Sequence, residues 1–389
     1  MTKTRIIAIY LPQFHPIPEN DKWWGKGFTE WTNVGRAKPL FRGHDQPKVP
    51  ADLGYYDLRV PEVREAQAEL AREAGVEGFC YYHYWFGDGQ RLLERPFNEV
   101  LQSGRPDFPF CLCWANHTWS NGTWEKSKAR TTDSILMEQR YPGVEDYKLH
   151  FRTVLPAFLD KRYMTVDGKP IFVVYHPWDL PDARQFIDTW QTLARENGLP
   201  GIHFVAMSPA TSSHEKQADG SIKVVLPNLE SSADLYHKVL DLGFDAVNSF
   251  GKRRGELMSK GKWSTYAREV LLRLGLNRKL VYDYPRAVKY FFAPEDRWDN
   301  VYPTIMPGYD RTARIGNGEG IFLHNTPENF KRHVLDAIGM VKDKPEERRI
   351  IFLNAWNEWG EGCYVEPDMT YGHGYLDAIR TALEESGQI

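Results

Sequence analysis

Short runs of apolar residues recur along the chain, and longer segments with regularly spaced apolar residues lie between them. The short runs are rich in β-branched and aromatic residues and show little alternation, which is typical of strands buried on both faces. The predicted strands are Arg5 to Tyr10, Val76 to Trp85, Phe108 to Trp114, Pro170 to His176, Ile202 to Ser208, Phe244 to Phe250, Val301 to Pro307 and Ile350 to Trp356.

The intervening segments have the spacing of amphipathic helices, and several end at a glycine, as helices often do. The predicted helices are Val60 to Ala74, Glu145 to Leu159, Ala183 to Asn197, Ser232 to Leu242, Pro327 to Val341 and Gly374 to Glu385. Strand and helix alternate about eight times without a change in composition, which predicts an α/β fold: one (β/α)8 TIM barrel domain over residues 1–389.

Four long insertions interrupt this alternation, and each follows the carboxyl end of a predicted strand. They are Leu11 to Tyr56, Ala115 to Val144, Pro209 to Ser231 and Gly251 to Asn300. Because TIM barrels build their active sites from the loops at this end, we expect the insertions to form a cleft at the C-terminal face.

The candidate catalytic groups follow the last predicted strand, in the stretch Arg349 to Pro367. Glu358 and Glu361 lie three residues apart, beside two tryptophans, and Gly360 and Gly362 leave the backbone free to turn. Two carboxyl groups in different environments can act as acid and base on a glycosidic bond, while tryptophan rings can pack on a sugar face. Two solvent-exposed glutamates in a loop, with Trp356 and Trp359 in the core, would give the same local pattern.

Polar and aromatic residues gather at the ends of the other predicted strands. Packing explains any one of them, but as a set at one end of successive strands they predict a sugar-binding cleft. The candidate substrate-binding residues are Tyr10, Gln13, His15, Trp31, Tyr82, His83, Trp85, Trp114, Asn116, His117, Tyr175, His176, Asn248, Tyr309, Asp310, Trp356, Asn357 and Trp359.

Composition narrows the range of partners. Aromatic residues make up 14% of the 389 residues, which is typical of carbohydrate-binding proteins, and the formal net charge of -3 gives no reason to expect nucleic acid as a partner. The sequence contains no predicted membrane span and no signal-peptide pattern, so a cytoplasmic location is expected. Cys111 and Cys113 alternate within one predicted strand and are interpreted as buried thiols. The sequence leaves the oligomeric state open.

We predict neither a metal nor a cofactor. The sequence lacks H-E-x-x-H, G-x-S-x-G and P-loop motifs. His83, His117, His176 and His324 do not have a recognisable ligand spacing, so hydrogen bonding within the core or to a ligand is the preferred interpretation. The short basic stretch Gly251 to Arg254 is interpreted as a solvated patch on an insertion.

Several longer motifs are distinctive: A-I-Y-L-P-Q-F-H-P-I-P-E-N, G-F-T-E-W-T-N-V, D-L-G-Y-Y-D-L, G-F-C-Y-Y-H-Y-W-F, G-K-P-I-F-V-V-Y and N-A-W-N-E-W-G-E-G. Together they resemble the WbsX-like family, which is similar to glycoside hydrolase family 99, the endo-acting α-mannosidases and mannanases. The similarity to family 99 is strongest at Glu358, Trp359, Glu361, Gly362, Glu366 and Pro367.

The resemblance implies a barrel, no metal, and retaining hydrolysis in which the substrate's 2-hydroxyl attacks the anomeric carbon to give a 1,2-anhydro sugar. It implies that Glu358 is the base for that hydroxyl and Glu361 the acid for the leaving oxygen. The residues themselves leave a direct nucleophile or an inverting base equally open. The W-A-N motif is followed here by His117 and Thr118, where many members of the family have glutamate, which implies a different substrate subgroup.

The sequence analysis favours a glycoside hydrolase acting on a bacterial surface or other complex polysaccharide. The first alternative is a glycosyltransferase or transglycosylase in O-antigen or capsule biosynthesis. The sequence has no D-x-D motif and no two-domain Rossmann pattern, which argues against this alternative. The second alternative is a carbohydrate-binding barrel without catalysis. The sugar, its linkage and the choice between endo and exo action do not follow from the sequence.

Overall fold

Parallel strands form a closed ring in the computed structural model, which describes residues 3–121, 135–209, 214–216, 222–224, 232–273, 279–316 and 318–388. Within these ranges the ring has eight strands: β1 (Arg5–Tyr10), β2 (Gly78–Trp85), β4 (Phe110–Trp114), β8 (Lys169–Val174), β9 (His203–Pro209), β12 (Ala246–Phe250), β14 (Val301–Ile305) and β16 (Ile350–Leu353). They pair in the order β1, β16, β14, β12, β9, β8, β4, β2, and β2 pairs with β1 to close the ring. The predicted (β/α)8 barrel is confirmed.

The barrel strands are buried along almost their whole length, as the apolar runs predict. The side chains of Ile171 to Val174 in β8 are inaccessible to solvent. In β1, Ile7 pairs with Phe352 on one side and with Gly78 on the other. A Cβ atom on Gly78 would lie 2.5 Å from the Pro109 carbonyl oxygen, so glycine is required where β2 begins.

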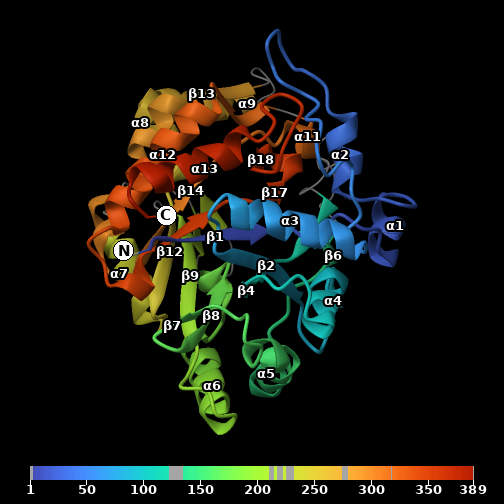
Figure 1. The fold of residues 1–389 in the computed structure, drawn as a ribbon, viewed down its shortest axis with the longest axis vertical. Coiled ribbons are helices and arrows are strands. Elements are labelled where there is room, and N and C mark those ends of the chain that lie inside the picture. Colours follow the sequence, from blue (N-terminus) through green and yellow to red (C-terminus); the bar gives the residue numbers. More distant parts are fainter. Residues whose placement is uncertain are drawn as a thin grey trace.

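Helices cover the outside of the ring (Figure 1). They are α3 (Pro61–Glu73), α4 (Arg95–Ser103), α5 (Val144–Phe158), α6 (Ala183–Glu196), α7 (Ser232–Asp241), α12 (Pro327–Val341) and α13 (Gly374–Glu385). All except α4 were predicted, with bounds that differ by at most one residue at either end. In α6 the N-cap Asp182 accepts a hydrogen bond from the Gln185 amide, and the helix buries Phe186 and Trp190 on its inner face.

The sequence did not predict α4. This helix has nine residues, and its short apolar pattern of Phe97, Val100 and Leu101 is too brief to separate it from a loop. It ends at Gly104, whose φ of +70° is a left-handed conformation that suits glycine.

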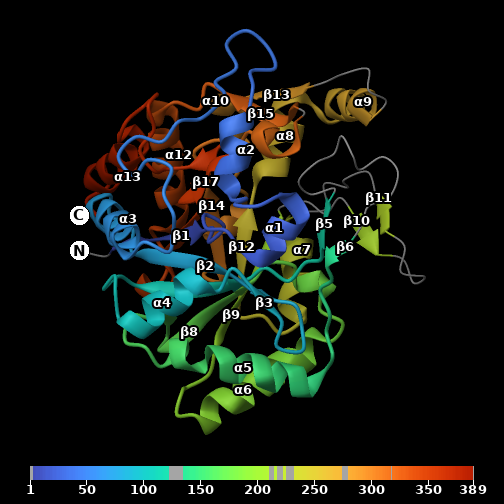
Figure 2. The ribbon, with the colours of Figure 1, turned by 90° about the vertical axis from the view of Figure 1, so that its right-hand side faces the viewer.

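The insertions lie over the C-terminal end of the barrel, which faces the viewer in Figure 2. Their elements are α1 (Pro18–Trp24), α2 (Glu30–Arg36), β5 (Trp119–Ser120), β6 (Ile135–Met137), β10 (His214–Lys216), β11 (Ile222–Val224), α8 (Lys252–Lys260), α9 (Lys262–Arg273), β13 (Lys279–Asp283), α10 (Tyr284–Ala287), α11 (Thr312–Ile315), β15 (Gly318–Leu323), β17 (Asn357–Glu358) and β18 (Cys363–Tyr364). Parts of the predicted insertions after the third and fifth strands lie outside the described residues.

Two further details were not predicted. Strands β13 and β15 form a small parallel pair outside the ring, because the insertions after β12 and β14 lie beside each other there. The short strands β3 (Arg91–Leu92) and β7 (Thr165–Val166) pair antiparallel with β2 and β8.

Candidate active site

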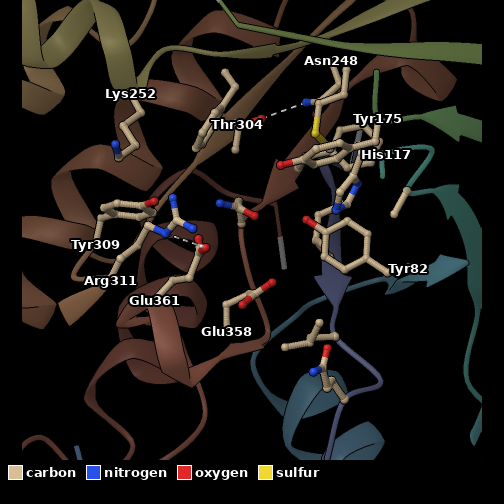
Figure 3. Close-up of a pocket in the computed structure, with 18 of the residues that line it drawn as sticks. Tyr82, His117, Tyr175, Asn248, Lys252, Thr304, Tyr309, Arg311, Glu358 and Glu361 are labelled. Atoms are coloured by element: carbon tan, nitrogen blue, oxygen red, sulfur yellow. Dashed lines mark hydrogen bonds and ion pairs between the residues drawn. The ribbon is translucent and has the colours of Figure 1, made fainter. Parts of the chain in front are cut away.

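A cavity of about 290 Å³ opens at the carboxyl ends of the barrel strands. Its wall contains charged residues on one side and aromatic and amide residues on the other (Figure 3). The lining residues are Ile9, Leu11, Gln13, Tyr82, Tyr84, Ala115, His117, Trp119, Tyr175, Met207, Asn248, Phe250, Lys252, Thr304, Tyr309, Arg311, Arg314, Phe352, Asn354, Glu358 and Glu361.

Glu358 and Glu361 both line this cavity, from a tight turn that follows β16. Glu358 ends β17, and Glu361 ends the 3-10 helix η6 (Trp359–Glu361). Gly360 lies where a Cβ atom would overlap Glu30 Oε1, and Gly362 has a φ of +56°. Both glycines are therefore needed for the turn that brings the two carboxyl groups to one wall.

A single guanidinium group connects the two carboxyl groups. Arg314 Nη2 lies 2.7 Å from Glu358 Oε2, and Arg314 Nη1 lies 2.7 Å from Glu361 Oε1. Arg314 Nη2 also lies 3.0 Å from Oε1 of Glu30, a fully buried residue of α2. Arg314 belongs to α11, so the site joins the loops that follow β1, β14 and β16.

Glu361 has a second arginine beside it. Arg311 Nε lies 3.2 Å from Glu361 Oε1 (Figure 3). Burial by itself would raise the pKa of Glu361, but Arg314, Arg311 and Lys252 together hold that pKa below its usual value. Glu361 is therefore ionised at neutral pH.

Glu358 has the opposite shift. Burial and the charges of Glu361 and Glu30 together raise its pKa to about 7, although Arg314 acts in the lowering direction. Two carboxyl groups three residues apart thus differ in charge state near neutral pH, as an acid and a base in one site must.

The opposite wall carries aromatic rings and amide groups. Tyr82, Tyr175 and His117 face the cavity across from the charged residues in Figure 3. Burial lowers the pKa of His117 to about 4, so the imidazole is neutral at pH 7. Asn248 Nδ2 donates to Thr304 Oγ1 at 2.8 Å, which fixes the amide against the wall. Gln13 Nε2 has no hydrogen-bond partner among the described residues and can serve a ligand.

The predicted substrate-binding residues divide into two groups. The first group lines the cavity beside the predicted catalytic pair and consists of Gln13, Tyr82, His117, Tyr175, Asn248 and Tyr309. Those that are not part of its wall are Tyr10, His15, Trp31, His83, Trp85, Trp114, Asn116, His176, Asp310, Trp356, Asn357 and Trp359. A sequence cannot separate these groups, because neighbouring residues at a strand end point in different directions.

The tryptophans near the glutamate pair pack behind the site and bind a third buried carboxyl group. Trp356 Nε1 and Trp359 Nε1 donate to Glu366 at 2.9 and 2.6 Å. Tyr56 and Gln67 donate to the same carboxyl group at 2.9 and 2.6 Å. Burial raises the pKa of Glu366 to about 7, against the lowering effect of these four donors. This carboxyl group holds the back of the site and does not line the cavity.

Most of the other predicted residues outside the wall have hydrogen bonds within the protein. Asn357 bonds both backbone groups of Leu11, and Asp310 accepts from His44 and Gln46. The remaining polar contacts are Tyr10 with Gln67, His15 with Pro12, Trp31 with Tyr56, His83 with His150, Trp85 with Asp146, Trp114 with Trp85, and Asn116 with His176. These residues position the elements that carry the wall.

Arg314, Lys252 and Tyr84 were not predicted as site residues, although all three line the cavity. Arg311 also lines it, and its place at a strand end beside Tyr309 and Asp310 had drawn attention to it in the sequence. Arg311 and Arg314 lie one helical turn apart just after P-G-Y-D, and Lys252 follows the sixth strand almost directly. Their positions after strand ends were the available signal, but a basic residue in a loop is usually solvated.

Two of the four histidines considered together in the sequence lie side by side: the ring centroids of His117 and His176 are 5.8 Å apart. The other two lie elsewhere, because His83 bonds His150 and His324 bonds Asp283. Within the part of the chain that the structure describes, no group of three or more His, Cys, Asp or Glu residues could hold a metal ion. The four cysteines are buried free thiols. None of the described helices is long and apolar enough to cross a membrane.

Comparisons with known proteins agree with this geometry. Residues 6–379 match the family model described as Glycosyltransferase WbsX. Two proteins from strains of Xanthomonas campestris pv. campestris, each named uncharacterized protein WxcX, are 36% identical over 386 residues. The match covers 99% of this chain and 50% of each relative, so the chain spans half the length of these relatives.

Solved structures of similar fold include glycoside hydrolases. A glycoside hydrolase-like protein has a TM-score of 0.56 at 15% identity, covering 99% of this chain and 94% of its own. A GH99 endo-alpha-mannosidase from Bacteroides thetaiotaomicron has a TM-score of 0.56 at 13% identity, covering 98% and 96%. At this identity the likeness establishes a shared fold.

Proposed function

The chain belongs to the family described as Glycosyltransferase WbsX, and from that membership and the geometry of the cavity we propose that it is a carbohydrate-active enzyme that hydrolyses a glycosidic bond. The family resemblance found in the sequence is thereby confirmed. The substrate we propose is a complex polysaccharide, such as one of a bacterial surface.

The observation that carries the proposal is the pair Glu358 and Glu361, joined by Arg314 and shifted in pKa in opposite directions. Glycosidases need one protonated and one ionised carboxyl group on either side of the scissile bond. We propose the retaining course that the family resemblance implies, in which the two carboxyl groups lie about 5 Å apart instead of the roughly 6.5–9.5 Å of inverting enzymes.

In the proposed mechanism the proton is on Glu358 in the unliganded enzyme. Glu358 donates this proton to the leaving oxygen as the bond to the anomeric carbon breaks. Glu361 remains ionised beside its two arginines and is the second carboxylate, which takes the proton of an attacking hydroxyl or attacks the anomeric carbon itself. Water then attacks the anomeric carbon of the intermediate and gives a proton to Glu358. Glu361 either returns its proton to the sugar hydroxyl or leaves the anomeric carbon as a carboxylate, so both groups are regenerated and the anomeric configuration is retained.

This assignment reverses the roles that the family resemblance implies, in which Glu358 is the base and Glu361 the acid. The physical reason is the unequal distribution of cations. Arg311 and Lys252 act on Glu361 in addition to Arg314, while Glu358 has Arg314 and two neighbouring glutamates.

The test is the release of reducing ends from a panel of bacterial surface polysaccharides and α-mannans, without nucleotide sugar. We expect release by the wild type and by Glu328→Gln, a control whose carboxyl group is 61% exposed on α12. Glu358→Gln and Glu361→Gln should each lose at least about a hundredfold. Equal activity in all four proteins would contradict the proposal.

The printed description of the family favours a second candidate function, transfer of the sugar to an acceptor. A retaining intermediate can be opened by another sugar in place of water, so the same pair of carboxyl groups supports a transglycosylase. A transferase would be favoured if the wild type consumed a nucleotide sugar and released no reducing ends, and if Glu361→Gln no longer consumed the nucleotide sugar. Tight glycan binding with neither activity would favour a non-catalytic binding protein.

A further inference from the structure

The insertion after β12 differs in charge from the rest of the chain. Residues 251–279 contain nine Lys or Arg residues and two Glu residues, whereas the whole chain has a formal net charge of -3. This segment includes α8 and α9, and Glu256 of α8 is already bonded to Lys252 and Arg253. Positive charge is therefore concentrated in this part of the sequence.

Helix α9 is amphipathic in sequence. Trp263, Tyr266, Ala267, Val270 and Leu271 follow the spacing i, i+3, i+4, i+7, i+8, which places apolar residues along one face. In α6 the same spacing buries Phe186, Ile187, Trp190 and Ala194 in the core.

In α9 this face is open to solvent. Trp263 is 75% exposed, Val270 52% and Leu271 41%. Met258, on the neighbouring helix α8, is 43% exposed. Arg268, which is also exposed, lies on the same helix. Three large apolar side chains of α9 and one of α8 are thus exposed, and exposed apolar side chains gathered along one helix face are unusual on a surface that faces water.

The surface lies at the edge of the face that carries the cavity, where α9 projects beside α8 in Figure 2. Helix α8 begins at Lys252, whose Nζ lies 3.9 Å from the centre of the Tyr309 ring in the cavity wall. A partner bound to α9 would therefore lie on the side of the molecule that carries the cavity (Figure 2).

We propose that α9 docks this protein on an anionic lipid surface. Interfacial helices combine an apolar face containing tryptophan with flanking Lys and Arg residues, which is the composition seen here. Each basic residue near an anionic bilayer adds attraction, and the apolar face enters the boundary between head groups and acyl chains. This inference goes beyond the proposed hydrolase activity and does not depend on it.

The experiment is co-sedimentation of the 389-residue protein with vesicles of phosphatidylcholine alone and of phosphatidylcholine mixed with phosphatidylglycerol. We expect at least about tenfold stronger partitioning onto the anionic vesicles, falling as salt is added. No binding to anionic vesicles at low salt would overturn the proposal.

The variant that removes the apolar face is Trp263→Ser with Val270→Ser. Its matched control is Trp178→Ser with Leu159→Ser, whose side chains are 43% and 59% exposed elsewhere on the surface. We expect the first variant to lose binding at least about tenfold and the control to retain it. Arg268→Glu should weaken binding to the anionic vesicles only. Equal loss in both double variants would overturn the assignment to α9.

Two further measurements separate the alternatives. The thermal unfolding midpoint should be unchanged in all of these variants, which shows that they fold without reference to the proposed activity. Sedimentation velocity tests whether a second copy covers the same face. The proposal would be overturned if the wild type did not bind vesicles and instead formed a dimer that is lost in Trp263→Ser with Val270→Ser. The surface would then be assigned to self-association.

Discussion

At the scale of single residues, the site depends on how a few cations are shared among several carboxyl groups. Arg314 contacts Glu30, Glu358 and Glu361, and Arg311 contacts only Glu361 within this group. Each cation lowers the pKa of the carboxyl group that it approaches. Because the cations are shared unequally, the two candidate catalytic groups differ in pKa. This arrangement yields two predictions.

The first prediction concerns which glutamate is the proton donor. Glu358→Gln should lose activity on a natural glycoside by about 10²- to 10⁴-fold, but retain most of it on an activated aryl glycoside whose leaving group needs no proton. Glu361→Gln should lose activity on both substrates. Measurement of kcat/KM on the two substrates tests this, and the reverse pattern would assign the donor role to Glu361.

The second prediction concerns pH. Glu361 must be ionised for catalysis, so its lowered pKa sets the acidic limb of the pH profile of kcat/KM. Glu358 must be protonated, so its pKa of about 7 sets the alkaline limb. Arg311→Gln removes a cation from Glu361, raises the pKa of Glu361 and should move the acidic limb to higher pH. The measurement is kcat/KM against pH.

The control for this profile is Arg286→Gln, because the Arg286 side chain is 79% exposed. It should leave both limbs in place. An unchanged acidic limb in Arg311→Gln would show that Glu361 does not set it.

At the scale of elements, the turn from β17 through η6 to β18 determines where the two carboxyl groups point. Asn357 pairs with Tyr364, and Glu358 pairs with Cys363, in the antiparallel ladder that closes this turn. Helix α2 packs against the turn and brings Glu30 beside Gly360, where there is no space for a side chain. The contact between α2 and η6 is therefore a requirement for the geometry of the site.

The third prediction is that Gly360→Ala impairs both folding and activity. The added Cβ would overlap Glu30 Oε1, so either Glu30 or the turn must move, at a cost of about 1–3 kcal/mol. Urea denaturation and kcat/KM measure the two effects. The control is Gly339→Ala in α12, where a Cβ meets nothing within 4 Å, and this change should stabilise the helix by about 0.5–1 kcal/mol. Equal stability of the two variants would show that the turn tolerates the methyl group.

At the scale of the whole molecule, the buried carboxyl group of Glu366 joins the two ends of the chain. Its donors come from the loop before α3, from α3 itself and from the segment after β16. The closing pairs of the barrel, β1 with β16 and β1 with β2, lie in the same region. One buried carboxyl group thus connects the segment around α3 with the segment that carries the candidate catalytic pair.

The fourth prediction is that Glu366→Gln lowers the free energy of unfolding more than Glu358→Gln or Glu361→Gln does. An amide cannot accept from all four donors, and each buried donor left unpaired costs about 1–3 kcal/mol. Thermal and urea unfolding should show the loss, while Glu69→Gln, a carboxyl group 60% exposed, should leave stability unchanged. A wild-type unfolding midpoint in Glu366→Gln would contradict this role.

The sequence by itself determined the barrel. Its eight strands and six of its outer helices follow from local apolar spacing. A strand buried on both faces and an amphipathic helix can each be recognised from residues that are only a few positions apart in the chain. It also placed Glu358 and Glu361 after the last strand, where barrels carry their sites. The short helix α4 and the pair β13 and β15 left patterns too brief to detect.

Only the tertiary structure decided which residues surround the glutamate pair and what charge each glutamate carries. Glu30, Arg314 and Glu358 are far apart in the chain and meet only when the loops after β1, β14 and β16 converge. The direction of a side chain at a strand end depends on those loops, so tryptophans that appeared to face a sugar instead bind Glu366. A pKa depends on burial and on neighbouring charges, and both are properties of the folded molecule.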